Sequence, residues 1–312
     1  MALSPIVGLW DGPSVTVSEL MGSPLIIPTK MKEMIAGAYL SEALFRNAGG
    51  NSNGMVQFSE GDPSFLDVDI DVVSEFGEIP IGSGSRGMAR IATAMKFGKG
   101  VRVSKEMIDE NKIDHLNTQM KQLRNTFARF DARSAKALLD AKVPAEAVGT
   151  AWNEPGSNPW TDVADAIDTI SNAAPDAALG GSDDEGYEFS PDTIVINPGL
   201  YATLAANAEL AKMFTGNLAD QNMLYTGQMP NTILGLTVLT SKTWPRDRVL
   251  VLERGTIGGK SDTRPLQFTP MYPEGNGPNG GPRETFRSDG TEKTVRFVDQ
   301  PKAGLWLTGI AA

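Results

Sequence analysis

The chain contains no cysteine, so disulfides, cysteine-ligated zinc and thiol catalysis are all excluded. This absence fits synthesis in a reducing cytoplasm. No apolar run approaches the roughly 18 residues of a membrane span, and the amino terminus lacks a basic segment followed by an apolar one, so we expect neither a membrane span nor a signal peptide. The net charge of −10 disfavours a protein that reads nucleic-acid sequence, because neutralising phosphates requires a basic face. It does not exclude a container for nucleic acid.

Histidine is almost as scarce, since His115 is the only one in 312 residues. It lies beside the apolar stripe of a predicted helix, where a solvated side chain is expected and a general base is not. What the chain does contain is ordinary for a globular protein, with 40% hydrophobic and 21% charged residues. That composition supplies apolar material for one large or two medium domains.

A long hairpin is the first distinctive feature of the sequence. Apolar and acidic residues alternate strictly from Leu66 to Val72, which predicts a half-buried strand with Asp67, Asp69 and Asp71 on one face. A glycine-rich segment, Gly82–Gly87, is the predicted tip. The return segment Met95–Val103 is basic, so we expect the two arms to pair in charge as well as in hydrogen bonds. A hairpin of about 35 residues is too long to bury itself.

A very long amphipathic helix follows the hairpin. Ser104 is the predicted N-cap, and neither glycine nor proline occurs from Lys105 to Ala141. Apolar residues spaced three and four apart form one stripe, made of Ile113, Leu116, Met120, Leu123, Phe127 and Phe130. At 1.5 Å per residue this helix would be roughly 55 Å long, which suits a part that spans something.

The other segments predict an α+β organisation. Residues 1–28 indicate an extended arm, and a helix from Thr29 to Arg46 closes at Gly49-Gly50. Two further helices are expected near Trp160–Ala173 and from Asn197-Pro198 through Phe214. The predicted strands of this region are Thr193–Ile196, Leu236–Leu239, Val249–Leu252, Thr294–Val298 and Gly304–Leu307. Trp244 and Trp306 are expected in the core.

Two glycine-rich segments come close to nucleotide-binding motifs. Gly82–Gly87 matches the spacing of the dinucleotide fingerprint, but a polar, proline-containing segment precedes it and no helix follows. Gly255–Ser261 ends like a phosphate loop, yet Arg254 stands where its first glycine is required, so an ordinary inter-domain loop is expected. A nucleotide-dependent enzyme that uses Gly82–Gly87 stays open as the alternative from a different class.

The acidic residues of the hairpin come equally close to a calcium-binding loop. Asp67, Asp69, Asp71 and Glu78 fall at the ligand positions of an EF-hand, but Val72 stands where that loop needs glycine. We therefore expect an outward strand face and no metal, cofactor or catalytic residue.

The order of these parts resembles the major capsid proteins of tailed bacteriophages, with their Hong Kong 97-like fold. Three stretches, 43–49, 75–81 and 101–107, are similar in particular to capsid proteins of phages infecting actinobacteria. The resemblance implies an α+β fold with an N-arm at 1–47, an E-loop at 48–103, a spine helix of the P-domain at 104–141 and an A-domain at 142–261. It further implies P-domain return strands at 262–300 and a C-terminal strand at 301–312 that rejoins the A-domain.

The same resemblance implies a structural function in the virion. Copies would assemble in the host cytoplasm, as hexamers and pentamers, into an icosahedral shell around double-stranded DNA held without sequence-specific binding. Implied partners are a portal, a decoration protein and a separate scaffolding protein, the last because only 28 mostly extended residues precede the first helix. An encapsulin-type nanocompartment is the alternative that shares the fold. The candidates for contacts between subunits are Asp67, Asp69, Asp71, Arg86, Arg90, Lys96 and Arg102.

Overall fold

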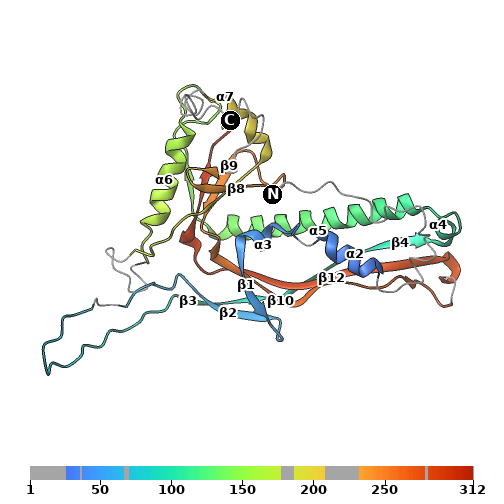
Figure 1. The fold of residues 1–312 in the computed structure, drawn as a ribbon, viewed down its shortest axis with the longest axis horizontal. Helices are drawn as coiled ribbons and strands as arrows, with labels where there is room; N and C mark the ends of the chain where they lie inside the picture. The colour runs from blue at the N-terminus through green and yellow to red at the C-terminus, as the bar shows by residue number, and fades with distance from the viewer. Residues whose placement is uncertain are drawn as a thin grey trace.

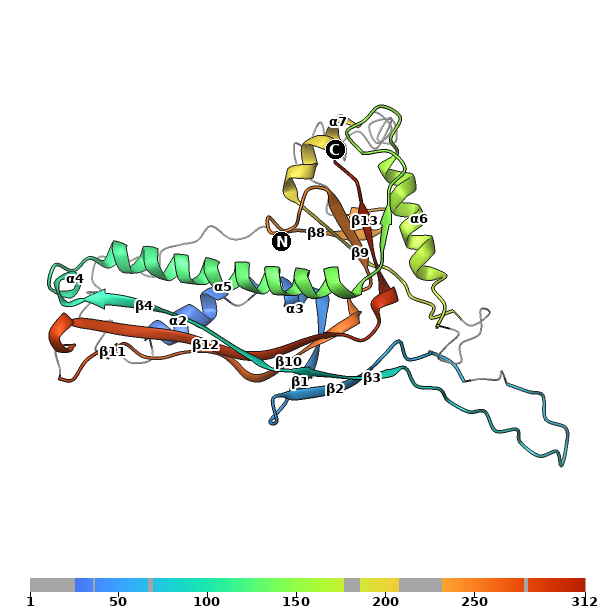
Figure 2. The ribbon, with the colours of Figure 1, turned by 180° about the vertical axis from the view of Figure 1, so that it is seen from behind.

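The computed structural model describes residues 26–35, 37–66, 70–176, 186–207, 232–277 and 280–311. The molecule is elongated, with a long sheet and a long helix side by side, a second sheet standing at one end, and a loop that projects beyond both (Figures 1 and 2). Within the described parts, no helix is both long and apolar enough to cross a membrane.

The long sheet has five strands. The strand order is β1 (Phe45–Gly50), β10 (Gly255–Phe268), β12 (Thr285–Val298) and β11 (Tyr272–Pro273). All of β4 (Met95–Ser104) also pairs antiparallel with β12. The sequence predicted only the last five residues of β12. The interpretation of Gly255–Ser261 as a loop was wrong, because these residues begin β10 and pair with both β1 and β12.

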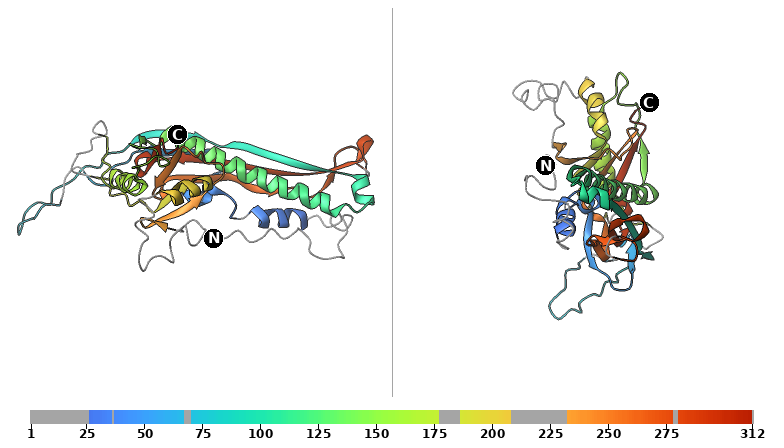
Figure 3. Two further views of the ribbon diagram at one scale, coloured as in Figure 1. Left: turned by 90° about the horizontal axis from the view of Figure 1, so that it is seen from above. Right: turned by 90° about the vertical axis from the view of Figure 1, so that its right-hand side faces the viewer.

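The spine is two helices, α4 (Lys105–Asp109) and α5 (Ile113–Lys142), and not one. Ser104 caps α4 as predicted, since its hydroxyl accepts a hydrogen bond from the Met107 N–H at 3.3 Å. The break comes at Asn111, whose φ of 48° is left-handed and incompatible with a continuous helix. The 30 residues of α5 span about 45 Å along one face of the long sheet (Figure 3).

Most of the predicted stripe on α5 lies in the core. Leu116, Met120, Leu123 and Phe127 are buried against the sheet, and His115 is exposed as expected. Phe130 is not part of this core, because its side chain is 40% exposed and rests on Phe97 of β4, with 4.5 Å between ring centroids.

The predicted helix from Thr29 to Arg46 is also divided. It forms α2 (Ile26–Ile35) and α3 (Leu40–Leu44), separated at Gly37, whose φ of +70° a helix does not tolerate. The chain then enters β1, so Gly49-Gly50 closes a strand and not a helix. A buried network holds α3 in place: Asp131 of α5 accepts a hydrogen bond from the Ser41 N–H and pairs with Arg296 of β12 at 2.6 Å.

The second sheet has six strands in the order β5-β13-β9-β6-β8-β7. They are β5 (Ala145–Ala147), β13 (Gly304–Thr308), β9 (Arg248–Leu252), β6 (Thr193–Ile196), β8 (Leu236–Thr240) and β7 (Thr232–Ile233), and the strands predicted here are confirmed. Helix α6 (Pro159–Ser171) covers it, and Trp244 stacks on Trp306 in its core with 5.6 Å between ring centroids. Asn197 caps a 3₁₀ turn leading into α7 (Tyr201–Ala206). The helix predicted without a break through Phe214 was wrong, because the backbone at Asn207 is already extended. Residues 208–214 lie outside the described residues, as does nearly all of the acidic loop at 180–186.

Candidate functional site: a projecting hairpin

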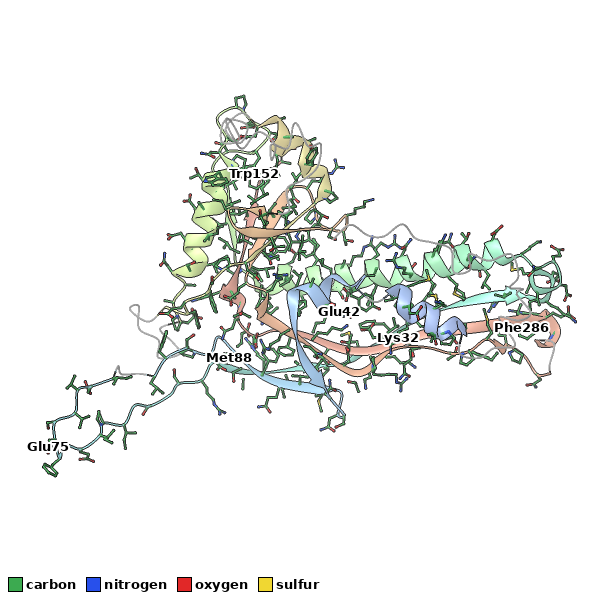
Figure 4. The ribbon with its side chains drawn as sticks, viewed as in Figure 1. Lys32, Glu42, Glu75, Met88, Trp152 and Phe286 are labelled. Atoms are coloured by element: carbon green, nitrogen blue, oxygen red, sulfur yellow. The ribbon has the colours of Figure 1, made fainter. Side chains whose placement is uncertain are left out.

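The projecting part of the molecule is a hairpin whose base alone is a sheet. Strands β2 (Met55–Glu60) and β3 (Met88–Thr93) pair antiparallel, from Met55 opposite Thr93 to Glu60 opposite Met88. Residues 61–87 continue beyond them as a long loop without ladder hydrogen bonds among the described residues. The loop turns at Ser74–Gly77, where the Gly77 N–H donates to the Ser74 carbonyl at 2.8 Å, and Figure 4 shows Glu75 at the far end.

This geometry corrects three expectations about the hairpin. The tip is Ser74–Gly77, and Gly82–Gly87 lies on the way back to β3. The described residues of the predicted strand, Leu66 and 70–72, are not in a strand; Asp67 and Asp69 lie outside the described residues. The basic segment Met95–Val103 does not pair with them, because β12 offers it ten consecutive backbone partners. The predicted charge pairing between the two arms of one chain is therefore wrong.

The hairpin concentrates the exposed apolar surface of the molecule. Twelve of the fourteen large hydrophobic side chains exposed among the described residues fall between Met55 and Met95. Near the tip the exposed fraction is 95% for Ile70, 98% for Phe76 and 91% for Ile81. Apolar surface gathered in this way marks an interaction site, because single scattered residues are what a solvated surface usually shows.

The root of the hairpin is fixed to the long sheet. Phe58 of β2 stacks on Phe297 of β12, with 4.7 Å between ring centroids. The Gly61 N–H donates to the Asp299 carbonyl at 2.8 Å, and the Tyr187 hydroxyl donates to the Gly61 carbonyl at 3.1 Å. Gly87 has no room for a side chain, since a Cβ there would lie 2.2 Å from the carbonyl oxygen of Glu60. The loop is thus held out from a rigid base.

Glu60 is the electrostatic centre of this root. Its carboxylate pairs with Arg90 of β3 at 2.8 Å and with Lys142 at the end of α5 at 2.6 Å. Burial raises the pKa of Glu60, but the hydrogen bonds from Lys142 and Arg90 outweigh burial and leave the pKa below its ordinary value. The two strands of the hairpin and the spine helix are therefore joined through one ionised carboxylate.

The predicted contact residues do not form one cluster. Asp71 and Arg86 are exposed on the loop, whereas Arg90 is engaged with Glu60 at the root. Lys96 is exposed on β4, opposite Lys293 of β12, and Arg102 pairs with Glu274 toward the other end of the molecule. Their role between subunits stays a prediction.

Sequence reasoning missed the apolar residues of the tip, above all Phe76, Ile79 and Ile81. The alternation of Leu66–Val72 and the glycines of 82–87 are regular patterns with known structural meanings, and the tip has none. The available signal was weaker: several large apolar residues in a stretch with neither helical nor strand periodicity. Such residues have no obvious partner in their own chain.

The context of Gly82–Gly87 does not suit a dinucleotide. This segment leads into strand β3, whereas the fingerprint requires a strand before it and a helix after it. Among the residues described, no group of three or more histidine, aspartate or glutamate side chains is placed to hold a metal ion.

The arrangement of parts defines a Hong Kong 97-like capsid fold. The capsid of cyanophage P-SCSP1u aligns with a TM-score of 0.60 at 12% identity, over 88% of this chain and 89% of that one. A structure of Microbacterium phage Oxtober96 gives 0.58 at 15% identity, over 86% and 90%. A virus-like particle from Pyrococcus furiosus gives 0.56 at 10% identity, over 91% and 98%.

The family follows from the sequence itself. Residues 87–307, well over half of the chain, match the model of the family described as phage capsid protein, so the chain belongs to that family. It is a phage major capsid protein, a structural component of the virion's icosahedral shell and not an enzyme. Solved structures with the same fold include those of phages of Microbacterium and Mycobacterium, both actinobacterial. A comparison with curated proteins finds no match.

Proposed function

We propose that this chain forms hexamers and pentamers, and that these close into the shell around double-stranded DNA by laying each projecting hairpin on a neighbouring copy. The observation that carries the proposal is the apolar surface of the hairpin, which its own chain leaves exposed from Met55 to Met95. Burying one large apolar side chain contributes about 1.5–3 kcal/mol, so a few of the twelve would offset the cost of ordering the loop.

The rigid root supports the same proposal. A loop on a flexible linker would lose much orientational freedom on docking. Here the contacts of Phe58, Gly61 and Glu60 already fix the orientation of the loop in the free subunit, so this cost is smaller. Repeating one such contact around a ring of identical copies produces closed assemblies.

The two sheets support a division into domains. We propose a peripheral domain built from α5 and the five-stranded sheet, and an axial domain built from the six-stranded sheet with α6 and α7. Residues 1–47 would be the N-arm, 48–103 the E-loop with its flanking strands, and 104–141 the spine. The axial domain would occupy residues from 142 and the C-terminal strand, with the return to the peripheral domain at Gly255, where β10 begins.

Other partners belong to the proposal as well. A portal, a scaffolding protein and a decoration protein would complete the particle, and assembly would take place in the host cytoplasm. The net charge of −10 supports DNA enclosed without sequence-specific binding, because a strongly acidic chain does not hold phosphates tightly.

Replacing Ile70–Ile81 by a short Gly-Ser turn tests the proposal, because it removes the tip and leaves β2, β3 and the root contacts intact. The subunit should keep its circular dichroism spectrum and unfolding midpoint, while closed particles seen by electron microscopy should disappear. A matched control replaces residues 276–277, which are exposed next to β11, by the same linker and should still assemble. Normal particles from the tip variant would refute the proposal.

A further inference from the structure

The outer face of the spine helix α5 carries positive charge along one row of side chains. Lys121, Asn125, Arg129 and Arg133 are spaced four residues apart, so they form one continuous ridge along the helix. Arg129 and Arg133 are exposed, and Lys121 is half-buried at the flank. In the part of the chain that the structure describes, none of these three cations takes part in an ion pair, because those of α5 are made by Asp131, Lys136, Asp140 and Lys142. We call Lys121, Arg129 and Arg133 the basic ridge.

The basic ridge differs in sign from the chain as a whole. The net charge is −10, and helix α6 carries three aspartates and no basic residue. Between His115 and Leu139, by contrast, α5 has five basic residues and one acidic residue, Asp131, which is buried and paired with Arg296. A local excess of positive charge in an acidic chain indicates a surface that meets an anion.

The side chains between the cations favour phosphates over a protein surface. Gln122, Asn125 and Thr126 are exposed, and their residue types commonly donate hydrogen bonds to phosphate oxygens. Among the described side chains of α5, Phe130 is the only large hydrophobic one that is exposed, and its ring rests on Phe97. The contact with a protein partner usually has an apolar centre, which this face lacks.

The length of the basic ridge suits the backbone of duplex DNA. From Lys121 to Arg133 the helix rises about 18 Å, at roughly 1.5 Å per residue. One strand of a duplex carries a phosphate about every 3.4 Å along its axis, so the ridge can lie beside about five of them. Guanidinium groups bind phosphate oxygens in pairs. Because the other side of α5 is packed on the long sheet (Figure 3), only this ridge can touch a duplex, which favours contacts to the backbone over contacts to base edges.

We propose that the basic ridge of α5 faces the enclosed double-stranded DNA and binds its phosphates without reading sequence. The inference rests on the proposed enclosure of DNA and names the surface that meets it. It also assigns the α5 side of the long sheet to the inside of the shell. Each copy binds weakly, because the acidic remainder of the chain repels phosphate, but every copy in the shell repeats the contact.

The salt dependence of DNA binding tests the proposal. Unassembled subunits are titrated into a fluorescein-labelled duplex of about 20 base pairs, and the anisotropy is followed between about 50 and 200 mM NaCl. Neutralising about three phosphates should lower the binding constant about 40-fold over this range. Replacing the ridge by Lys121→Gln, Arg129→Gln and Arg133→Gln should lower the affinity at about 50 mM at least about tenfold and remove most of the salt dependence.

Two further variants separate the charge of the ridge from the net charge and from the structure. Lys242→Gln with Arg264→Gln and Arg283→Gln removes the same charge from exposed positions outside α5, and its affinity should stay within about twofold of the parent. Arg129→Lys with Arg133→Lys keeps the positive charge and should retain binding. A triple ridge variant that binds DNA as the parent does would overturn the proposal, and loss of assembly in that variant would then assign the ridge to a protein contact.

Filled particles provide a second measurement. Formaldehyde joins lysine amines to the amines of nearby bases, and mass spectrometry after nuclease and protease digestion identifies the peptides that carry nucleotides. The peptide that contains Lys121 is the expected product. Adducts confined to lysines away from α5, such as Lys242 between β8 and β9, would overturn the proposal.

The inference and the proposed docking of the hairpin fail in different ways. If the tip replacement abolishes particles while the triple ridge variant binds DNA like the parent, the docking stands and the ridge is not a DNA contact. If the tip variant still forms closed particles while the triple ridge variant loses DNA affinity, the ridge stands and the docking is wrong.

Discussion

The six-stranded sheet and the projecting hairpin use similar residues in opposite ways. Every residue of β6 is buried, and Val249–Leu252 of β9 are fully buried beside it. In the hairpin, Ile70, Val72 and Phe76 are each at least 95% exposed. Apolar sequence alone does not distinguish them. The sheet finds its partners within the chain, whereas we propose that the hairpin finds them on another copy.

One substitution in each region tests most directly whether their apolar side chains contribute differently to subunit stability. Trp306→Ala removes a fully buried indole that stacks on Trp244, so the free energy of unfolding should fall by about 3–5 kcal/mol. Phe76→Ala removes a side chain with 98% exposure, so subunit stability should stay within about 0.5 kcal/mol while particle yield falls. Urea unfolding of unassembled subunits measures the first quantity and sedimentation the second. Equal destabilisation by both substitutions would mean that the tip packs within its own chain.

The spine helix α5 allows a buried and a partly exposed phenylalanine to be compared within one element. Phe127 is buried and meets Phe268 edge-on at 6.0 Å, whereas Phe130, three residues on, is 40% exposed. Phe127→Ala should therefore cost about 3–5 kcal/mol by opening a cavity. Phe130→Ala should cost less than half as much, and His115→Ala almost nothing. Thermal unfolding of the three variants ranks them, and a larger loss at Phe130 would place the core on a different face of α5.

Where the sequence carried a regular pattern with a partner in the same chain, prediction succeeded. The spine stripe, the Ser104 cap, α6 and the strands of the six-stranded sheet are all recognisable, because burial imposes their periodicity. Breaks were less predictable. Gly37 and Asn111 interrupt helices without a proline, each with a positive φ that the apolar periodicity does not record.

The hairpin shows a different limit of structure prediction from sequence. The alternation from Leu66 to Val72 predicts a strand, but a strand requires a neighbour, and β12 takes β4 instead. The pattern is visible in the sequence, but the described residues of this segment, Leu66 and 70–72, do not form a strand. The exposed Phe76, Ile79 and Ile81 carried no periodicity at all, so only the structure identified them.

The root of the hairpin predicts a smaller, pH-dependent effect. Glu60 has a folded-state pKa below its ordinary value of 4.5, so its ion pairs contribute fully above about pH 4.5. That contribution is lost as the pH falls through the folded-state pKa. Glu60→Gln should cost about 1 kcal/mol or less at pH 7, because Arg90 and Lys142 are partly solvated, and less than that at pH 3.

Unfolding curves of the parent and the Glu60→Gln variant across this pH range measure the difference. Glu33→Gln is the matched control, since Glu33 pairs with Lys30 on an exposed helix surface and should show little effect at either pH. A Glu60→Gln penalty that is equal at pH 3 and pH 7 would contradict the assigned role of the carboxylate.

The central claim is that the hairpin's apolar surface is completed by a neighbouring copy, and hydrogen–deuterium exchange tests it most directly. Backbone amides are compared between unassembled subunits and closed particles. The account predicts that residues 70–87 exchange rapidly in the subunit and slow by at least about a hundredfold in the particle, while β6 and β9 are protected equally in both. Rapid exchange of residues 70–87 in the intact particle would contradict it.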